Sequence, residues 1–302
     1  MSEFKDLSVP NVEPGSAEWL GYMSASKIAA VVGHSEYDSY FSLWHRMNGT
    51  IEPEPDDDIK RRGHYLEPAI AAWFADQHPE WEIRETGMWI NPECEWQSAS
   101  PDRIVITGDG PQLLQIKSDA AHEYGEPGTD QVPIGYFDQV QWEMHVTGIH
   151  TCHLAVILPF LIFAEYVIEY DAEYAAALVD AAEPFMLSLL AGKKPSIDPM
   201  DGHTATYRAV KELHPDIDDE DVVLPDELAT AFLQANETKK AAEQTVQAAK
   251  SVIAEYMGNA KSCSWNSKKL FGRQCRNGGT PYMVAAKNLP SITTTEGEVK
   301  AA

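Results

Sequence analysis

The spacing of hydrophobic residues changes twice between residues 59 and 170, and this restricts the possible folds more than any other feature. Leu66, Ile70 and Phe74 recur at helical spacing, which predicts an amphipathic helix over about 59–77. From Trp81 onward the residues favour strands instead. The expected elements there are three strands at 82–90, 96–107 and 112–117, a helix at 134–147, and two strands at 151–158 and 163–170.

This order predicts an α/β fold, with a mixed central sheet flanked by helices. Short turns join the first three strands, so they are expected to be antiparallel neighbours, and the helix at 134–147 crosses to the next strand. The other expected helices lie at 24–33, 38–48 and 171–191. Residues 1–15 resemble a loose arm, and the core domain is predicted to span 16–199.

The last third of the chain, 200–302, is predicted to be a helical appendage with short strands and a basic tail. Hydrophobic residues at alternating spacings of three and four predict a long helix at 226–257. The stripe consists of Leu228, Phe232, Ala235, Ala242, Val246, Ala249, Ile253 and Tyr256. It suits a partner helix in an oligomer, and it suits an intramolecular helical hairpin equally well.

The formal net charge of −24 argues against a protein that coats nucleic acid by bulk electrostatics, because phosphate repels such a surface. It is compatible with an enzyme that meets DNA in a local basic groove or through a divalent metal. Residues 259–287 carry six bases and no acid. They are interpreted either as a solvated face or as a patch that grips the DNA backbone, with Lys268, Lys269 and Arg273 as candidate DNA contacts.

A cytoplasmic location without membrane contact is expected. No apolar run approaches the roughly 20 residues that cross a bilayer, and the first residues do not resemble a signal peptide. The four cysteines are far apart and contain no C-x-x-C, so neither a disulfide framework nor a zinc site is expected. If the gene is carried by a phage, the location would be the bacterial host cell.

The segment from Ser98 to Lys117 contains the residues most suited to catalysis. Asp102 begins one strand, and Gln115 and Lys117 lie two residues apart on the return strand, so their side chains share a face. The hairpin can bring Asp102 next to them. Oxygen ligands of this kind suit Mg²⁺, with Mn²⁺ as a substitute, and a lysine beside the metal suits phosphodiester hydrolysis. The alternative is a surface hairpin with a solvated aspartate and lysine.

Two neighbouring segments support this interpretation. In Gly63-x-x-x-Glu67 the glutamate lies on the expected helix beside its apolar stripe, where an unpaired carboxylate would be unfavourable. Gln139 lies on the crossing helix and can orient the lysine or a phosphate. Each residue also has a simpler interpretation, namely an exposed glutamate on a helix face and a capping or surface glutamine.

Together these segments resemble a known family, the YqaJ-type viral recombinases, which include lambda-type phage exonuclease and belong to the PD-(D/E)xK nucleases. The resemblance covers about residues 16–195 in collinear order. Its pieces are Ser24-Ala-Ser26, Gly63-x-x-x-Glu67, Ser100-Pro-Asp102, the strand ending at Ile116-Lys117, and Gln139-Val-Gln141 with Val146-Thr147. It implies a restriction-endonuclease-like core and a metal-dependent exonuclease.

The resemblance also implies roles for individual residues. Asp102, the residue at 115 and the Ile116 backbone carbonyl would be metal ligands, and Lys117 would be the catalytic lysine. Glu67 would lie in the acidic cluster near the metals and is counted as a further metal ligand, and Gln139 would position the site. The hydroxyl of Ser26 would contact a terminal 5′ phosphate, and Ser24 and Gln141 are counted with it as expected DNA contacts.

Two positions depart from the family pattern. Gln115 stands where the family has glutamate, and an amide oxygen can ligate Mg²⁺ but contributes no negative charge. The chain is then a natural variant that tolerates glutamine, a weakened enzyme, or the product of an engineered substitution. Before the early helix, residues 18–21 also lack the arginine that grips a terminal phosphate.

The function expected from this resemblance is resection of linear double-stranded DNA in the 5′→3′ direction. The product would carry 3′ single-stranded overhangs for a single-strand annealing protein, in the manner of phage recombination. The family forms rings, so a homo-oligomer is expected. Two alternatives stay open: a nuclease fold that binds DNA or a partner without cutting, motivated by Gln115, and an endonuclease on the same fold.

Overall fold

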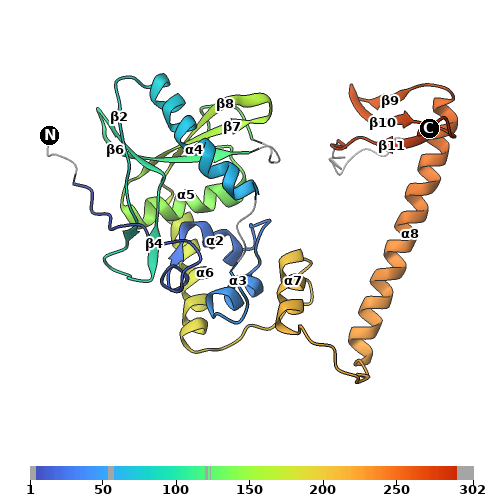
Figure 1. Ribbon diagram of the computed structural model, residues 1–302, viewed down its shortest axis with the longest axis horizontal. Coiled ribbons are helices and arrows are strands. Elements are labelled where there is room, and N and C mark those ends of the chain that lie inside the picture. The colour runs from blue at the N-terminus through green and yellow to red at the C-terminus, as the bar shows by residue number, and fades with distance from the viewer. Residues whose placement is uncertain (1–4, 54–57, 120–121, 123, 291–302) are drawn as a thin grey trace. The chain divides into compact units, whose positions relative to one another are not determined.

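The structure is a computed structural model that describes residues 5–53, 58–119, 122 and 124–290. The chain divides into two compact units, with the boundary after Ile217. Figure 1 shows the elements of both units.

A five-stranded mixed sheet forms the centre of the first unit, in the order β2-β5-β6-β7-β8. Its strands are β2 (Glu82–Arg84), β5 (Arg103–Thr107), β6 (Gly110–Ser118), β7 (Thr151–Leu158) and β8 (Ile162–Glu169). Only β6 and β7 are parallel, and helix α5 (Ile134–Thr147) connects them. Three antiparallel strands followed by a crossing helix and a parallel strand form a mixed sheet flanked by helices, which confirms the predicted α/β fold class.

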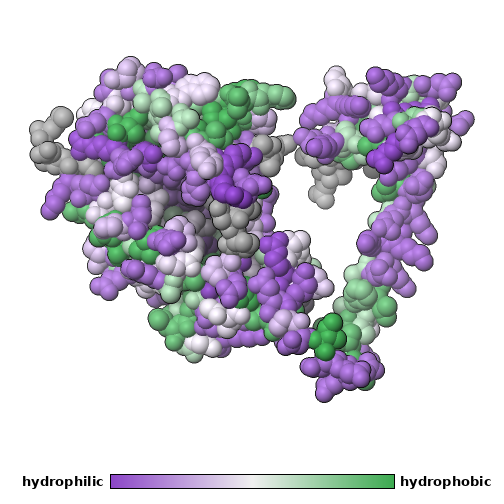
Figure 2. Space-filling model, in the orientation of Figure 1, coloured by the Kyte–Doolittle hydropathy of each residue, from purple (hydrophilic) through white to green (hydrophobic). Residues whose placement is uncertain are grey.

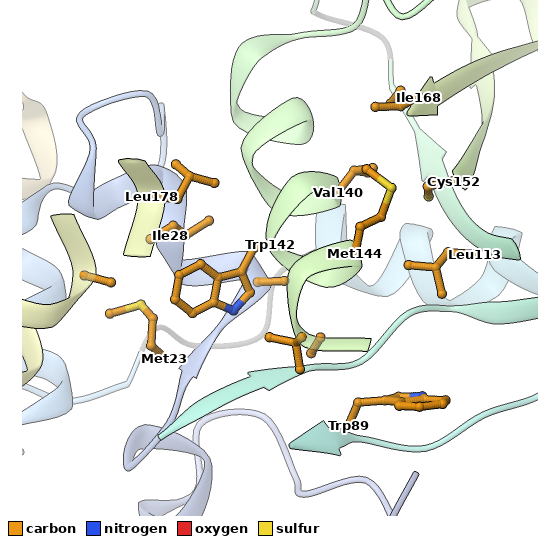
Figure 3. Packing of buried hydrophobic residues seen from close by; sticks show 14 of the residues in the cluster. Met23, Ile28, Trp89, Leu113, Val140, Trp142, Met144, Cys152, Ile168 and Leu178 are labelled. Atoms are coloured by element: carbon orange, nitrogen blue, oxygen red, sulfur yellow. The ribbon is translucent and has the colours of Figure 1, made fainter. Parts of the chain in front are cut away.

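Helices cover both faces of this sheet, as Figure 1 shows. Besides α5, the helices of this unit are α1 (Ala17–Leu20), α2 (Ala25–Val31), α3 (Tyr40–Met47), α4 (Asp58–Gln77), α6 (Ala172–Leu190) and α7 (Thr204–Leu213). Helix α4 packs on one face, where Ile70 and Phe74 meet Leu114 and Ile116. Helix α5 packs on the other face together with α2 and α6, and Figure 3 shows Trp142 in that core.

The alternation of side chains along β6 decides which residues meet which helix. Leu114 and Ile116 belong to the core beneath α4, whereas Leu113 belongs to the core beneath α5. Because successive side chains on a strand point to opposite faces, Gln115 and Lys117 share the α5 face with Leu113. The catalytic candidates on β6 therefore lie on the side of the crossing helix.

Two of the expected strands are each divided in the structure. The predicted strand 82–90 becomes β2 and β3 (Trp89–Ile90), and 96–107 becomes β4 (Gln97–Ala99) and β5. The β3 and β4 parts leave the central sheet and form a small second sheet with β1 (Met23–Ser24). Gly87 permits this departure, because a Cβ there would lie 2.0 Å from the Val9 carbonyl oxygen that pairs with Met88.

Helix α7 was not expected from the sequence, and it belongs to the first unit. Ala209 packs with Phe41 and Ile51, and the Thr206 hydroxyl lies 2.6 Å from the Ser39 hydroxyl. The first unit therefore continues to Ile217, beyond the predicted end of the core at residue 199.

The second unit consists of the long helix α8 (Asp226–Met257) and a three-stranded antiparallel sheet. The strands are β9 (Ser262–Trp265), β10 (Lys268–Gln274) and β11 (Tyr282–Ala285). The predicted hydrophobic stripe on α8 is exposed within the chain, with Leu228, Phe232 and Tyr256 all open to solvent. Figure 2 shows hydrophobic residues, in green, near the start of α8. Among the described residues, no helix combines the length and hydrophobicity that a membrane span needs.

Candidate active site

The carboxylate of Asp102 lies beside the middle of β6. Arg103 pairs with Leu114 in the antiparallel register, so the preceding residue, Asp102, comes next to Gln115. The Ile116 backbone N–H donates a hydrogen bond of 2.6 Å to Oδ2 of Asp102. The hairpin therefore brings Asp102 to the strand that carries Gln115 and Lys117, as the sequence predicted.

The surroundings of Asp102 change its protonation. Burial raises the pKa of Asp102 to about 6, and the charge of Glu67 adds to this rise. The ammonium of Lys117 and the Ile116 N–H act in the opposite direction, because both favour the carboxylate. A carboxyl with such a pKa binds a divalent cation in competition with a proton near neutral pH.

The ammonium of Lys117 is held from the α5 side. Its Nζ donates a hydrogen bond of 3.0 Å to Oε1 of Gln139, and it lies 5.0 Å from the centre of the Tyr136 ring. Gln139 thus contacts the lysine that it was predicted to orient. Tyr136 was not singled out from the sequence, and its contact with Lys117 is a cation–π interaction.

Gln115 and Glu143 bring two unpaired oxygens to the same region. Gln115 is buried, and its Oε1 has no hydrogen-bond partner in the described part of the chain. Glu143, on α5, is fully buried, and its Oε1 accepts a hydrogen bond of 2.9 Å from Nε2 of Gln139. Its Oε2 has no partner among the described residues either. Burial raises the pKa of Glu143 to about 8, opposed by the Gln139 hydrogen bond, and nearby Asp102 adds to the rise.

Glu67 lies on α4, the helix that covers the opposite face of the sheet. Its Oε1 accepts a hydrogen bond of 2.8 Å from Nη1 of Arg103, and the two side chains form a half-buried ion pair. Nη1 of Arg103 also donates a hydrogen bond to the Asp102 carbonyl, so Arg103 links Glu67 to Asp102. The predicted role of Glu67 as a metal ligand stays a prediction, and in this structure Arg103 is its partner.

The predicted DNA contacts fall in three different places. The hydroxyls of Ser24 and Ser26 lie 3.2 Å apart at the start of α2, where Ser26 is exposed. Gln141 is fully buried, since its amide donates to the Glu169 carbonyl and accepts from the Asp171 N–H. The structure therefore gives Gln141 a role in the core, joining α5 to the end of β8, in place of the predicted contact with DNA.

The basic candidates belong to the second unit. Lys268 and Lys269 are exposed on β10, and Arg273 on the same strand donates a hydrogen bond to the Gly258 carbonyl. Their predicted contact with DNA stays a prediction.

The donors present in the first unit fit a divalent cation that prefers oxygen. Within residues 5–53, 58–119, 122 and 124–290, no three His, Cys, Asp or Glu side chains are gathered so that they could hold a metal ion. The Asp102 carboxylate is hydrogen-bonded to the backbone directly after Gln115, and the buried amide oxygen of Gln115 lacks a partner among the described residues. Buried oxygens without a hydrogen-bond partner are rare, and an absent ion is one ordinary explanation for them. Hard oxygen donors of this kind suit Mg²⁺ or Mn²⁺.

Glu143 was not among the residues predicted from the sequence to belong to the site. The signal was the spacing: Gln139 and Glu143 are four residues apart on a predicted helix, so they share one face. Because Gln139 was predicted to approach Lys117, Glu143 on the same helix face could have been expected near Lys117 as well.

Comparison with known proteins gives one family and several structures of low identity. The LHK-Exo structure in complex with dAMP is 21% identical, covers 60% of this chain and 94% of that chain, and has a TM-score of 0.46. A second structure of this alkaline exonuclease from Laribacter hongkongensis is 23% identical and has a TM-score of 0.45. The match covers 59% of this chain and 92% of that chain. A phage-related exonuclease from Haemophilus somnus is 13% identical, covers 57% and 96%, and has a TM-score of 0.44. No protein with a curated description matches the chain.

The family match falls on the segments that carry the candidate site. The YqaJ-like viral recombinase domain matches residues 18–150, which include Asp102, the Gln115–Lys117 strand and helix α5. The resemblance drawn from the sequence is thereby confirmed. Residues 18–150 of this chain are therefore similar to the YqaJ-like viral recombinase domain family.

Proposed function

We propose that this chain is a metal-dependent exonuclease that resects linear double-stranded DNA from its ends. The observation that carries the proposal is the meeting of Asp102, Gln115 and Lys117 on one hairpin, with Asp102 hydrogen-bonded to the strand of the other two. A carboxylate, an amide oxygen and a lysine beside one another suit hydrolysis of a phosphodiester. The match to viral recombinases supports the same activity.

The proposed division of work follows from the contacts. Asp102, the Gln115 amide oxygen and the Ile116 carbonyl would hold Mg²⁺ or Mn²⁺. When bound, the cation supplies acidification of a water molecule and neutralises charge on the phosphate. Gln139 and Tyr136 hold the Lys117 ammonium at a defined place, where it stabilises the negative charge that develops on the phosphate.

The finer parts of the proposal concern polarity, assembly and partners. We propose 5′→3′ resection that leaves 3′ overhangs, a ring-shaped homo-oligomer that encloses DNA, and a single-strand annealing protein that receives the overhang. A ring suits the net charge of −24, because only its inner wall would need to be positive. The exposed stripe of α8 is the proposed contact surface between copies.

The test is digestion of linear duplex DNA labelled at the 5′ or at the 3′ end, with Mg²⁺ or Mn²⁺. Nucleotides should be released from the 5′ end, circular duplex should resist, and Asp102→Ala should remove the activity. Asp109→Asn is the matched control, because Asp109 is an exposed acid in the turn of the same hairpin. Equal release by the wild type and Asp102→Ala would refute the proposed site, and cutting of circular duplex would favour an endonuclease.

A second candidate is a protein of the same fold that binds DNA without cutting it. The observation that favours it is Gln115, which contributes no charge where the family has a carboxylate. Binding of duplex ends by the wild type, without release of nucleotides in either metal, would support this candidate over the exonuclease.

A further inference from the structure

Gln115 leaves the candidate site short of negative charge. Its amide oxygen is buried and has no hydrogen-bond partner within the described residues, so it is free to face a cation. A neutral oxygen binds a divalent cation less strongly than a carboxylate, because ligand charge sets much of the affinity. Because residue 115 is a glutamine, Asp102 is the hairpin residue that brings a carboxylate to the candidate site.

Helix α5 brings another carboxylate to this place. Glu143 is fully buried, and one hydrogen-bonded amide separates it from the catalytic lysine: Lys117 donates to Gln139, and Gln139 donates to Glu143. Lys117 and Gln115 share one face of β6, so these hydrogen bonds connect Glu143 to the strand face that carries Gln115. The charges of Asp102 and Lys117 also act on the pKa of Glu143, in opposite directions.

The contacts of Glu143 do not account for its presence in the core. Only Oε1 is hydrogen-bonded, and Oε2 lacks a partner in the described part of the chain. Burying a carboxylate with an unused oxygen is unfavourable, because that oxygen loses its hydrogen bonds to water without a replacement. One cation bound by Gln115 Oε1 and Glu143 Oε2 would account for both oxygens that lack a partner within the described residues.

We propose that Glu143 supplies the divalent cation with the negative charge that Gln115 lacks, so that a helix carboxylate replaces the strand carboxylate of the family. The inference rests on the proposed function, since it assigns a further ligand to the same cation site. The cation is then held by two carboxylates, those of Asp102 and Glu143, together with the amide oxygen of Gln115. On this basis the chain can hold the cation although residue 115 is a glutamine.

The competing role for Glu143 is purely structural: it would hold Gln139, which in turn holds Lys117. The two roles differ in what removal of the charge does. Glu143→Gln keeps the shape and leaves an amide oxygen that can still accept from Gln139. A structural role therefore predicts unchanged metal affinity, whereas a ligand role predicts a loss.

The experiment is a titration of the full-length protein with Mn²⁺ in the absence of DNA. Binding is measured by calorimetry and by the electron paramagnetic resonance signal of free Mn²⁺. Four proteins are compared: the wild type, Glu143→Gln, the double variant Gln115→Glu with Glu143→Gln, and Asp102→Ala. We expect Glu143→Gln to weaken Mn²⁺ binding about ten-fold or more. The double variant should recover most of the affinity, because it returns the carboxylate to the strand.

Urea unfolding in EDTA serves as the folding control, and Glu143→Gln should be at least as stable as the wild type there. Mn²⁺ affinity of Glu143→Gln equal to that of the wild type would overturn the inference, and so would a double variant that binds no better than Glu143→Gln alone. A wild type that binds no Mn²⁺ would overturn both this inference and the metal-dependent function. A wild type that binds Mn²⁺ through Asp102 and Glu143 but releases no nucleotides would overturn only the nuclease activity.

Discussion

Substitution of the buried Glu143 should change how the stability of the metal-free protein depends on pH. Burial raises the pKa of this carboxyl from its ordinary value of 4.5 to about 8. Between these two values the folded protein keeps the proton and the unfolded chain releases it. The unfolded state therefore binds fewer protons, so the free energy of unfolding falls as pH rises.

The size of the effect follows from the shift. Each pH unit in this window should lower the free energy of unfolding by about 1.4 kcal/mol, which sums to about 5 kcal/mol between pH 4.5 and 8. Glu143→Gln has no proton to lose and should lack this contribution. The variant should thus resemble the wild type near pH 5 and should be clearly more stable at pH 8.

The assay is urea unfolding in EDTA at several pH values from 5 to 8, followed by circular dichroism. Glu183→Gln is the matched control, because it removes one carboxylate from an exposed position on α6. The comparison of interest is the difference between Glu143→Gln and the wild type. A difference that stays constant across this range would refute the reasoning, since it would mean that Glu143 is already ionised at pH 5.

Two further outcomes are expected. Trp142→Ala should lower the free energy of unfolding, measured by urea denaturation, by about 3–5 kcal/mol, because Trp142 is fully buried and its Nε1 donates to the Ser98 carbonyl. A loss below about 1 kcal/mol would contradict the position of Trp142 in the core. Burial alone would raise the pKa of Glu165, but hydrogen bonds from His153 and His78 and their charge lower it. The stability that Glu165 contributes should therefore be present above pH 4.5 and lost as pH falls through its lowered pKa. Urea unfolding at pH 7 and at acid pH measures the difference in free energy of unfolding between the wild type and Glu165→Gln. This difference should become smaller in acid, and a larger difference there would contradict the prediction.

The sequence by itself determined most of the elements. Helical spacing found α4 and α8 to within a residue or so, and the predicted bounds of α5 and β7 match the structure. It also determined that Gln115 and Lys117 share a face, since alternation along a strand is a local property. The hairpin turn at 108–110 brought Asp102 into the same prediction, because turns and register act over short distances.

Tertiary structure decided where the strands divide and which buried groups meet. The separation of β3 and β4 from the central sheet depends on their pairing with each other, on β1 and on the approach of Val9 to Gly87, which lie far apart in sequence. Likewise, the spacing placed Glu143 on the face of Gln139, but it did not decide that Glu143 is buried. Its burial depends on how α5 packs against the sheet and on its hydrogen bond with Gln139, which holds Lys117.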